Sequence, residues 1–473
     1  MPIKTLHLTN AWSETSGGIA VFYRALLEAG NRREHSVRLV VPAEQDGVEE
    51  VGRFGRIYHL KARRARLNSK YRIIYPNQFA LAGSKIQQIL AAERPELVEI
   101  NDKYALNYLG PLLRLGLAGA LNYRPVVVGL SCERMDRNFA VYISGSDLAR
   151  RFCRAYMRWL YFPFFDHHIA ISRGTLEELR DASSGHIVRR GAWILPLGVD
   201  QHCFSPARRT PTARRQLEER AGADPKSVLL LYVGRLSPEK NLALLLETME
   251  RLGPDPVDYR LLVVGDGISR VLLEEESRRR LPERVRFFGH ISDRGSLARI
   301  YANCDFFLHP NANEPFGIAP LEAMASGLVL VAPDSGGVTE YANGQNACLA
   351  PPTAEDFAGM IRQVVRCPEL RQSVAASARA TAEALSWESV TDSYLHLYNC
   401  LWRVGKGAAP LQEAGASFLS TPPGDARRCV LAGAATAARN IFAGFSRLAP
   451  SGASNRSGFH TPPGERNVAE SLD

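Results

Sequence analysis

The chain has 473 residues, too many for one ordinary hydrophobic core, and this length favours two domains. Hydrophobic residues make up 45% and charged residues 23%, as is typical of a globular protein with a sizeable core. The eight cysteines lie tens of residues apart, without a CxxC pair or a zinc-type spacing, so the sequence argues against a zinc site and predicts free thiols in a reducing compartment.

The net charge of +9 comes from the first half of the chain. Residues 1–220 carry 33 Lys and Arg against 21 Asp and Glu, whereas the remainder carries 25 against 28. This excess favours an anionic partner for the first half: a membrane surface, an acidic acceptor or nucleic acid. A solvated basic face explains the same charge equally well.

The first residues run directly into a strand-like segment, without the apolar run of a signal peptide. No stretch approaches the roughly 20 apolar residues that span a bilayer. The sequence therefore predicts a cytoplasmic protein.

In chain order, the first half alternates short apolar runs with helix-like segments, which is typical of buried parallel strands. The pattern restarts after Asp200, so the sequence predicts an α/β protein with two doubly wound domains joined near 204–215. Strands are expected at 6–8, 36–41, 97–100, 125–130, 169–171, 228–233, 261–264, 285–288, 306–309 and 328–332, and helices at 19–28, 85–92, 242–252 and 321–325.

Residues 405–473 are rich in Ala, Gly, Ser and Pro and carry little periodicity. This composition predicts a mostly disordered low-complexity tail with a short helix at 435–445. Thr-Pro-Pro-Gly occurs at 421–424 and again at 461–464. The repeat can be a motif that binds a partner, but a duplicated linker without a function is the favoured explanation. A chain ending after Trp402 is expected to fold and act unchanged.

The segment 314–322 (EPFGIAPLE) places Glu314 and Glu322 on either side of a turn between a strand and a helix. Backbone N–H groups at such a helix N-terminus can bind a diphosphate or a sugar hydroxyl. Each carboxylate can hold vicinal hydroxyls by accepting two hydrogen bonds. A capped helix start with two solvent-facing acids explains the pair equally well.

The segment 233–241 (VGRLSPEKN) lies at the carboxyl edge where doubly wound sheets bind ligands. Arg235 and Lys240 can together neutralise a diphosphate leaving group, unless they only cap a surface turn. Glycines at 17–18 and 265–267 also follow strands and let backbone approach a phosphate, although turn geometry alone also selects glycine.

Together these segments resemble family 4 of the retaining glycosyltransferases, a GT-B family that includes sucrose synthases and bacterial phosphatidylinositol mannosyltransferases. The resemblance covers about residues 4–402. It implies two Rossmann-like domains facing each other across a cleft: an acceptor-binding domain at 1–205, completed by a crossing helix at 386–402, and a nucleotide-sugar-binding domain at 206–385. The matching segments are 17–18, 165–172, 196–200 with Phe204, 235–240, 265–267, 288–290, 314–322, and 336–337 with Glu340.

The resemblance also implies individual roles. Arg235 and Lys240 would bind the donor diphosphate and Glu314 the transferred sugar, and these three are the predicted catalytic residues. The leaving phosphate would take the acceptor proton, so neither a metal nor a cofactor is expected. The other implied donor contacts are Gly17 and Gly18 at the phosphate, the amides of Phe316, Gly317 and Ile318 at sugar and phosphate, Glu322 at the ribose, and Gly265 and His290 near the base.

The sequence departs from the family after the fourth expected strand, where many members place a His facing the reacting sugar. Here Ser131 or Cys132 occupies that place. Glu133 and Asp136 follow, and either can orient the acceptor or cap a helix start.

A basic and aromatic stretch follows at 150–165. Arg150, Arg154 and Arg158 recur at i, i+4 and i+8, so they are expected on one helical face. A second basic run at 63–72 is expected in a loop. Such a composition suits a membrane interface, and a packed helix with solvated arginines is the alternative.

The sequence therefore predicts a retaining glycosyltransferase that moves a hexose-type sugar from a nucleotide diphosphate sugar to an acceptor glycan, lipid or small molecule. The expected location is cytoplasmic, with peripheral attachment to the inner membrane face and no nucleic-acid partner. Alternatives are a nucleotide-sugar epimerase of the same fold and, because the His is missing, a non-catalytic nucleotide-sugar-binding protein. A nicotinamide dehydrogenase is disfavoured because no G-x-G-x-x-G follows an early strand.

Overall fold

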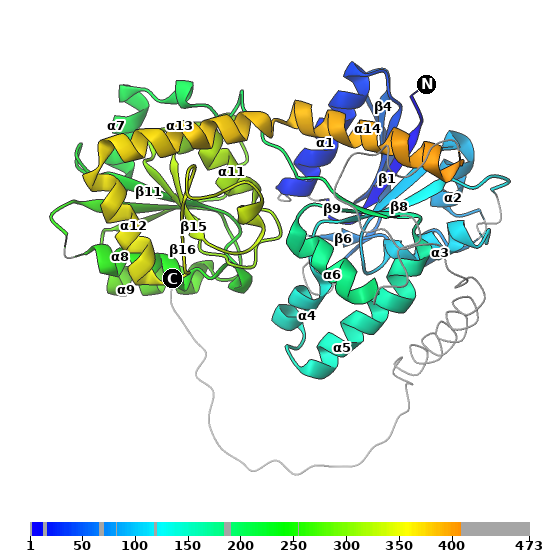
Figure 1. Ribbon diagram of the computed structural model, residues 1–473, viewed down its shortest axis with the longest axis horizontal. Helices are drawn as coiled ribbons and strands as arrows, with labels where there is room; N and C mark the ends of the chain where they lie inside the picture. The colour runs from blue at the N-terminus through cyan, green and yellow to red at the C-terminus, as the bar shows by residue number, and fades with distance from the viewer. Residues whose placement is uncertain are drawn as a thin grey trace, which may run out of the picture. The chain divides into compact units, whose positions relative to one another are not determined.

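The computed structural model describes residues 2–12, 17–65, 71–81, 83–117, 121–183, 191–253 and 255–407. The tail predicted beyond that point, with its repeated Thr-Pro-Pro-Gly and the helix at 435–445, lies outside these residues. Two mainly parallel sheets with helices packed on their faces make up the described chain (Figure 1), which confirms the expected α/β class.

The first sheet has eight strands in the order β10-β9-β8-β7-β1-β2-β4-β3, and every neighbouring pair is parallel except β3 with β4. Three of these strands were not predicted from the sequence: β3 is exposed and acidic, β4 alternates between buried and partly exposed residues, and β10 has only three residues. The strands are β1 (Thr5–Thr9), β2 (Val37–Ala43), β3 (Gly47–Val51), β4 (Gly55–Lys61), β7 (Leu97–Asn101), β8 (Val126–Ser131), β9 (His167–Ala170) and β10 (Ala192–Ile194).

The second sheet is parallel throughout, in the order β13-β12-β11-β14-β15-β16. Its residues alternate between two buried cores: Leu229 and Leu231 of β11 pack with one set of helices, and Leu230 packs with the other. Burial on both faces explains the continuous apolar runs in the sequence. The strands are β11 (Val228–Val233), β12 (Tyr259–Val264), β13 (Val285–Gly289), β14 (Phe306–Leu308), β15 (Val329–Pro333) and β16 (Cys348–Ala350).

Helices connect the strands of both sheets, so each strand of a parallel pair ends at the same edge. Among the described residues, no helix combines the length and apolar character needed to cross a bilayer. The helices are α1 (Gly18–Arg32), α2 (Lys85–Glu93), α3 (Leu109–Arg114), α4 (Met135–Tyr142), α5 (Asp147–Tyr156), α6 (Arg173–Ser183), α7 (Pro211–Ala221), α8 (Ala243–Leu252), α9 (Arg270–Arg280), α10 (Arg294–Asn303), α11 (Ile318–Ala325), α12 (Ala354–Arg366), α13 (Pro368–Ala384) and α14 (Trp387–Gly405).

Helix α14 returns the chain to the first sheet and packs on α1. Its start is fixed by a bridge between Val199 and Ser386. Farther along, the Tyr394 hydroxyl donates to the carbonyl of Leu195 at 3.0 Å, and the Tyr398 hydroxyl donates to the buried carboxylate of Glu99. The helix therefore belongs to the core of the first sheet, and it continues to Gly405, beyond the expected end at 402.

One expectation about basic residues is wrong. Arg63 and Arg64 form the short strand β5 (Arg63–Arg64), which pairs with β6 (Arg72–Ile73), so these residues do not lie in a loop. Helix α5 gives way to a π-helical turn at Met157–Tyr161, so Arg158 lies in a different type of helix from Arg150 and Arg154. The Arg158 guanidinium lies over the ring of Trp159 at 5.1 Å.

Candidate active site

The turns at the carboxyl edge of the second sheet pack backbone against backbone. The amide of Gly234 donates to Val264, and that of Gly265 donates to Gly289, at 3.0 and 2.8 Å. A Cβ on Gly265 would lie 1.9 Å from the Gly234 oxygen, and one on Gly267 would lie 2.1 Å from the Leu236 oxygen. Close turn packing alone therefore requires both glycines, whatever their part in binding.

The turn between Glu314 and helix α11 is held by hydrogen bonds with residues 337–341. The amide of Gly337 donates to the Glu314 carbonyl at 2.7 Å, and the Tyr341 hydroxyl donates to the Gly317 carbonyl at 2.5 Å. Gly317, with φ of 92°, is the N-cap of α11, so this helix begins at Ile318 and not at the expected 321. The first N–H groups of a helix have no partner within it; the predicted amide of Ile318 is one of them, and those of Phe316 and Gly317 directly precede it.

Glu314 and Lys240 form an ion pair at this edge. Lys240 Nζ donates to Glu314 Oε2 at 2.7 Å, and Asn311 Nδ2 donates to the same oxygen at 2.9 Å. Burial alone would raise the pKa of Glu314, but the charge and hydrogen bond of Lys240, with Asn311, lower it to about 2. Glu314 is therefore ionised at neutral pH, and two of the three Lys240 protons remain available to a ligand.

Glu322 is a buried residue of helix α11 and has the opposite pKa shift. Burial raises its pKa to about 7, against the charge of Arg294 at 3.8 Å and a hydrogen bond from the Tyr301 hydroxyl at 3.3 Å. Two carboxylates eight positions apart thus have different protonation behaviour.

The structure also places the predicted donor contacts Arg235, Gly18 and His290. The half-exposed Arg235 has Nη2 3.5 Å from Glu239, whose carboxylate also accepts from Tyr142 of α4 at 3.0 Å. Gly17 caps α1, and a Cβ on Gly18 would lie 2.8 Å from the Ile318 side chain, so the two predicted donor-binding turns are neighbours. His290 is exposed directly after β13.

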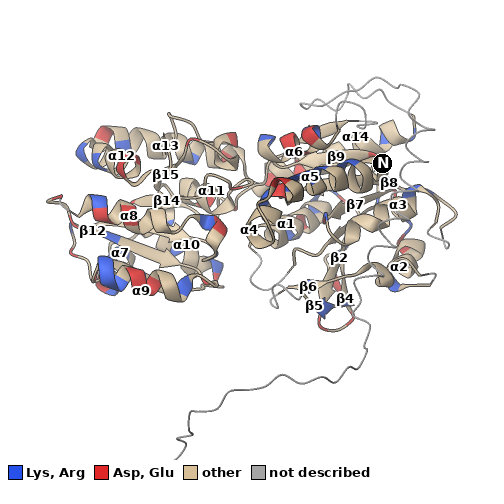
Figure 2. Ribbon diagram, turned by 90° about the horizontal axis from the view of Figure 1, so that it is seen from below, with Lys and Arg blue, Asp and Glu red and all other residues tan. Residues whose placement is uncertain are grey.

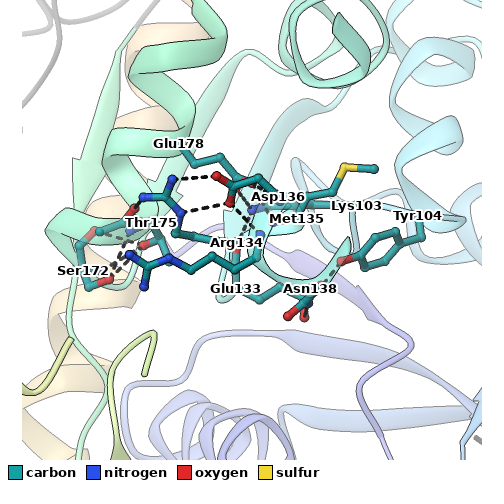
Figure 3. A network of polar contacts seen from close by, with 12 residues as sticks. Lys103, Tyr104, Glu133, Arg134, Met135, Asp136, Asn138, Ser172, Thr175 and Glu178 are labelled. Carbon is teal, nitrogen blue, oxygen red and sulfur yellow. Dashed lines mark hydrogen bonds and ion pairs between the residues drawn. The ribbon is translucent and has the colours of Figure 1, made fainter. Parts of the chain in front are cut away.

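The loop after β8, predicted to bind the acceptor, is held by a buried polar network (Figure 3). The almost fully buried Lys103 pairs with Glu178 at 2.5 Å and donates to the Glu133 carbonyl. Glu178 Oε1 accepts from the first two amides of α4, those of Met135 at 2.6 Å and Asp136 at 3.2 Å. The loop is thus held in place by Lys103 and Glu178, which belong to no recognisable motif. The only sequence feature that could have indicated them is that Lys103 lies two positions after the end of a strand.

The four residues predicted in this loop have different surroundings. Asp136 forms a two-pronged contact with Arg134, at 3.0 and 2.8 Å, and thus acts as a structural ion pair. Glu133 accepts from Asn138 at 2.8 Å, and burial raises its pKa. Burial also raises the pKa of the Cys132 thiol well above its usual value, which keeps it protonated. The Ser131 hydroxyl is buried and has no hydrogen-bond partner within the described part of the chain.

The two sheets with a charged, glycine-rich edge define a GT-B glycosyltransferase. Residues 17–198 match the glycosyl transferase 4-like domain, and residues 213–381 match the glycosyl transferases of group 1. The chain belongs to this family, family 4 of the glycosyltransferases, and is a glycosyltransferase. Membership of this family excludes both alternative classes, the nucleotide-sugar epimerases and the non-catalytic nucleotide-sugar-binding proteins.

Curated relatives and solved structures agree with this assignment. The chain is 28% identical over 397 residues to a GDP-mannose-dependent α-(1-6)-phosphatidylinositol dimannoside mannosyltransferase of Mycobacterium tuberculosis, covering 83% of this chain and 95% of the relative. A GDP-mannose-dependent α-mannosyltransferase of the same species is 30% identical, covering 65% and 73%. Sucrose-phosphate synthase of Thermosynechococcus elongatus has the same fold, with a TM-score of 0.68 at 21% identity, covering 85% of this chain and 100% of that one.

Proposed function

We propose that this glycosyltransferase moves a mannose-type hexose from GDP-mannose to a lipid-linked or anionic acceptor, with retention of configuration. Both curated relatives are named as GDP-mannose-dependent mannosyltransferases, which favours this donor over UDP and ADP sugars. The observation that carries the proposal is the Lys240–Glu314 ion pair beside the N-terminus of α11. Residues 1–205 with α14 would bind the acceptor, and residues 206–385 would bind the donor.

In this mechanism the second sheet's edge receives the charge that develops on the leaving diphosphate. Lys240 and Arg235 supply two cations, and the amides at the start of α11 supply fixed dipoles. The ionised Glu314 orients the sugar by accepting from its hydroxyls while it holds Lys240 in place. Glu322 binds the ribose hydroxyls.

The acceptor hydroxyl would attack from the face that the diphosphate leaves, and its proton would pass to the leaving phosphate. The new bond then has the configuration of the old one. Because cations and amides balance the charge, the proposed reaction requires neither a metal nor a cofactor. Domain closure would exclude water and limit hydrolysis of the donor.

The acceptor is proposed to be met at the inner membrane face. The first half carries the positive charge, and the relative from Mycobacterium tuberculosis is named for a phosphatidylinositol dimannoside acceptor. Arg150, Arg154 and Arg158 remain candidates for membrane contact, and the half-buried Arg158 lies over the ring of Trp159, which is 37% exposed.

The test is donor turnover by the purified full chain. GDP-mannose, UDP-glucose and ADP-glucose are compared by thermal shift and by release of the nucleoside diphosphate, with and without EDTA. We expect GDP-mannose to give the largest shift and EDTA to leave its turnover unchanged. Proton NMR of the first product must show the anomeric configuration of the donor; an inverted product, or turnover that needs a divalent cation, would contradict the mechanism.

A further inference from the structure

Exposed apolar side chains gather at the end of the α4–α5 hairpin. Of the large hydrophobic side chains that the described chain exposes, a group lies between 141 and 152: Val141, Tyr142, Ile143, Leu148 and Phe152. Ile143 is 60% exposed, Leu148 78% and Phe152 52%. Water-exposed apolar surface of this kind marks a site of contact with a partner or a membrane.

The hairpin presents these side chains on a rigid support. Helices α4 and α5 pack side by side (Figure 1), and Ser146 caps α5 by accepting from the Ala149 amide at 3.3 Å. Leu148 and Phe152 lie one turn apart on α5, beside the stripe of Cys153 and Tyr156 that packs into the protein. The rest of the protein therefore covers only part of the apolar face of α5 and leaves Leu148 and Phe152 exposed.

The same helix carries the cations that an anionic surface requires. Arg150, Arg151 and Arg154 are exposed on α5, with Asp147 as its one acid. Arg150 and Arg154 line a groove against α6 that also contains Asp136, Glu178 and Asp181, so these acids offset part of their charge. Elsewhere Figure 2 shows both signs of charge mixed along helices such as α9 and α12. Arg151 lies next to the strip of Leu148 and Phe152, whereas Arg150 and Arg154 lie farther around the helix. A helix with an exposed apolar strip and exposed arginines has the composition of one that lies in a bilayer interface.

The far end of α4 connects this surface to the acceptor loop. Helix α4 has eight residues, so its ends are about 12 Å apart. Its first turn is held by Glu178 and Lys103 next to Glu133 (Figure 3). A bilayer that contacts the hairpin end would thus lie at a fixed short distance from the loop proposed to bind the acceptor.

We infer that the α4–α5 hairpin docks the enzyme on an anionic bilayer, with Ile143, Leu148 and Phe152 inserted among the headgroups and Arg151 and Arg154 on lipid phosphates. The occupant is a lipid surface because both apolar and cationic groups are exposed along one helix. The inference rests on the proposed lipid-linked acceptor for its purpose, but vesicle binding can be measured without any acceptor or turnover.

The experiment is co-sedimentation of the full chain with phosphatidylcholine vesicles, with and without phosphatidylglycerol, at low and high salt. We expect binding to the anionic vesicles that weakens with salt. Leu148→Ser with Phe152→Ser should weaken it about tenfold or more, because apolar area no longer leaves water. Arg151→Gln and Arg154→Gln should each weaken it about fivefold, on anionic vesicles only.

The matched control is Val271→Ser with Leu272→Ser in α9, two side chains that are 67% and 61% exposed. It should bind vesicles as the wild type does, and all variants should keep the melting temperature and the donor hydrolysis of the wild type. Wild-type protein that ignores anionic vesicles at low salt overturns the inference, as do hairpin variants that bind normally. A hairpin variant that changes only the molecular mass in solution would identify a contact between two copies and also overturns it.

Discussion

The carboxyl edges of the two sheets use charge in different ways. At the second edge the charged groups are partly exposed, and Lys240 and Glu314 pair beside the N-terminus of α11. At the first edge the strongest ion pair is internal: Lys103 and Glu178 are almost fully buried and bond to backbone groups of the loop after β8. The second edge therefore offers charge to a ligand, whereas the first uses charge to fix a loop.

The proposed function gives the two edges different tasks. In it, the donor brings a diphosphate to the second edge, where Lys240, Arg235 and backbone amides receive its charge, and the acceptor meets the loop 131–136 at the first edge. We therefore expect substitutions at the first edge to lower stability most and substitutions at the second edge to weaken donor binding most.

The largest expected effect is on the first edge. Lys103→Met should destabilise the protein by about 3–5 kcal/mol, because it leaves the Glu178 carboxylate buried without its cation. Thermal denaturation of the full chain measures this as a lowered midpoint. Lys85→Met removes a half-exposed lysine and is the matched control. A Lys103→Met midpoint equal to that of the control would show that the pair does not hold this edge.

The next effect concerns the two glutamates of the second edge and pH. Because burial raises the pKa of folded Glu322 to about 7 from an unfolded value of 4.5, ionisation of Glu322 costs stability as the pH rises from about 4.5 to 7. The full shift corresponds to about 3 kcal/mol at most. Glu322→Gln should remove this slope in a series of melting curves.

Glu314 should give the opposite sign. Its pKa of about 2 in the folded protein means that its stabilisation is present above about 4.5 and is lost as the pH falls toward 2. Glu314→Gln should therefore flatten the acid side of the curve and leave the region above pH 4.5 unchanged in slope. Identical profiles for the two variants would mean that the carboxylates share one environment.

Donor binding is expected to respond to substitutions at the second edge. Arg235→Ala and Lys240→Ala should each weaken binding of a nucleoside diphosphate by about 1.5–3 kcal/mol, the usual value of a charged hydrogen bond. Calorimetry with GDP measures the loss. Arg251→Ala, at an exposed arginine of α8, should bind as the wild type does. Unchanged affinity in both test variants would remove the proposed diphosphate site.

The sequence predicted the second edge better than the first, for a physical reason. Arg235, Lys240 and Glu314 stand in short segments at strand ends, and parallel strands bring such ends together. The contacts of Asn311 with Glu314 and of Arg294 with Glu322 were not predicted, because a single polar residue near a turn forms no distinctive sequence pattern. The pair of Lys103 and Glu178 spans 75 residues and bonds mostly to backbone, which local sequence does not encode.

The predicted helix boundaries differ from the structure where the backbone conformation departs from what the side-chain pattern indicates. The spacing of Arg150, Arg154 and Arg158 predicted uniform α-helical winding, whereas the structure has a π-helical turn from Met157. Helix α11 starts at Ile318, ahead of the expected 321, because Gly317 adopts a left-handed conformation as its N-cap. The exposed apolar residues at 141–148 were missed because exposure cannot be read from hydrophobicity alone.

The smallest expected effect is that of removing the tail, which should alter neither edge. The composition beyond Gly407 cannot bury enough apolar surface to add a core, so a chain ending at Gly407 should keep the wild-type midpoint and transfer rate. The end at Trp402 is no longer expected to be neutral, because α14 continues to Gly405, where a Cβ would lie 2.5 Å from Val126 of the first sheet. Ending there removes backbone bonds such as that from Lys406 to Trp402, at a cost on the order of 1 kcal/mol. The two truncations, melted side by side, locate the end of the folded chain. A lower midpoint for the chain ending at Gly407 would show that the tail stabilises one of the sheets.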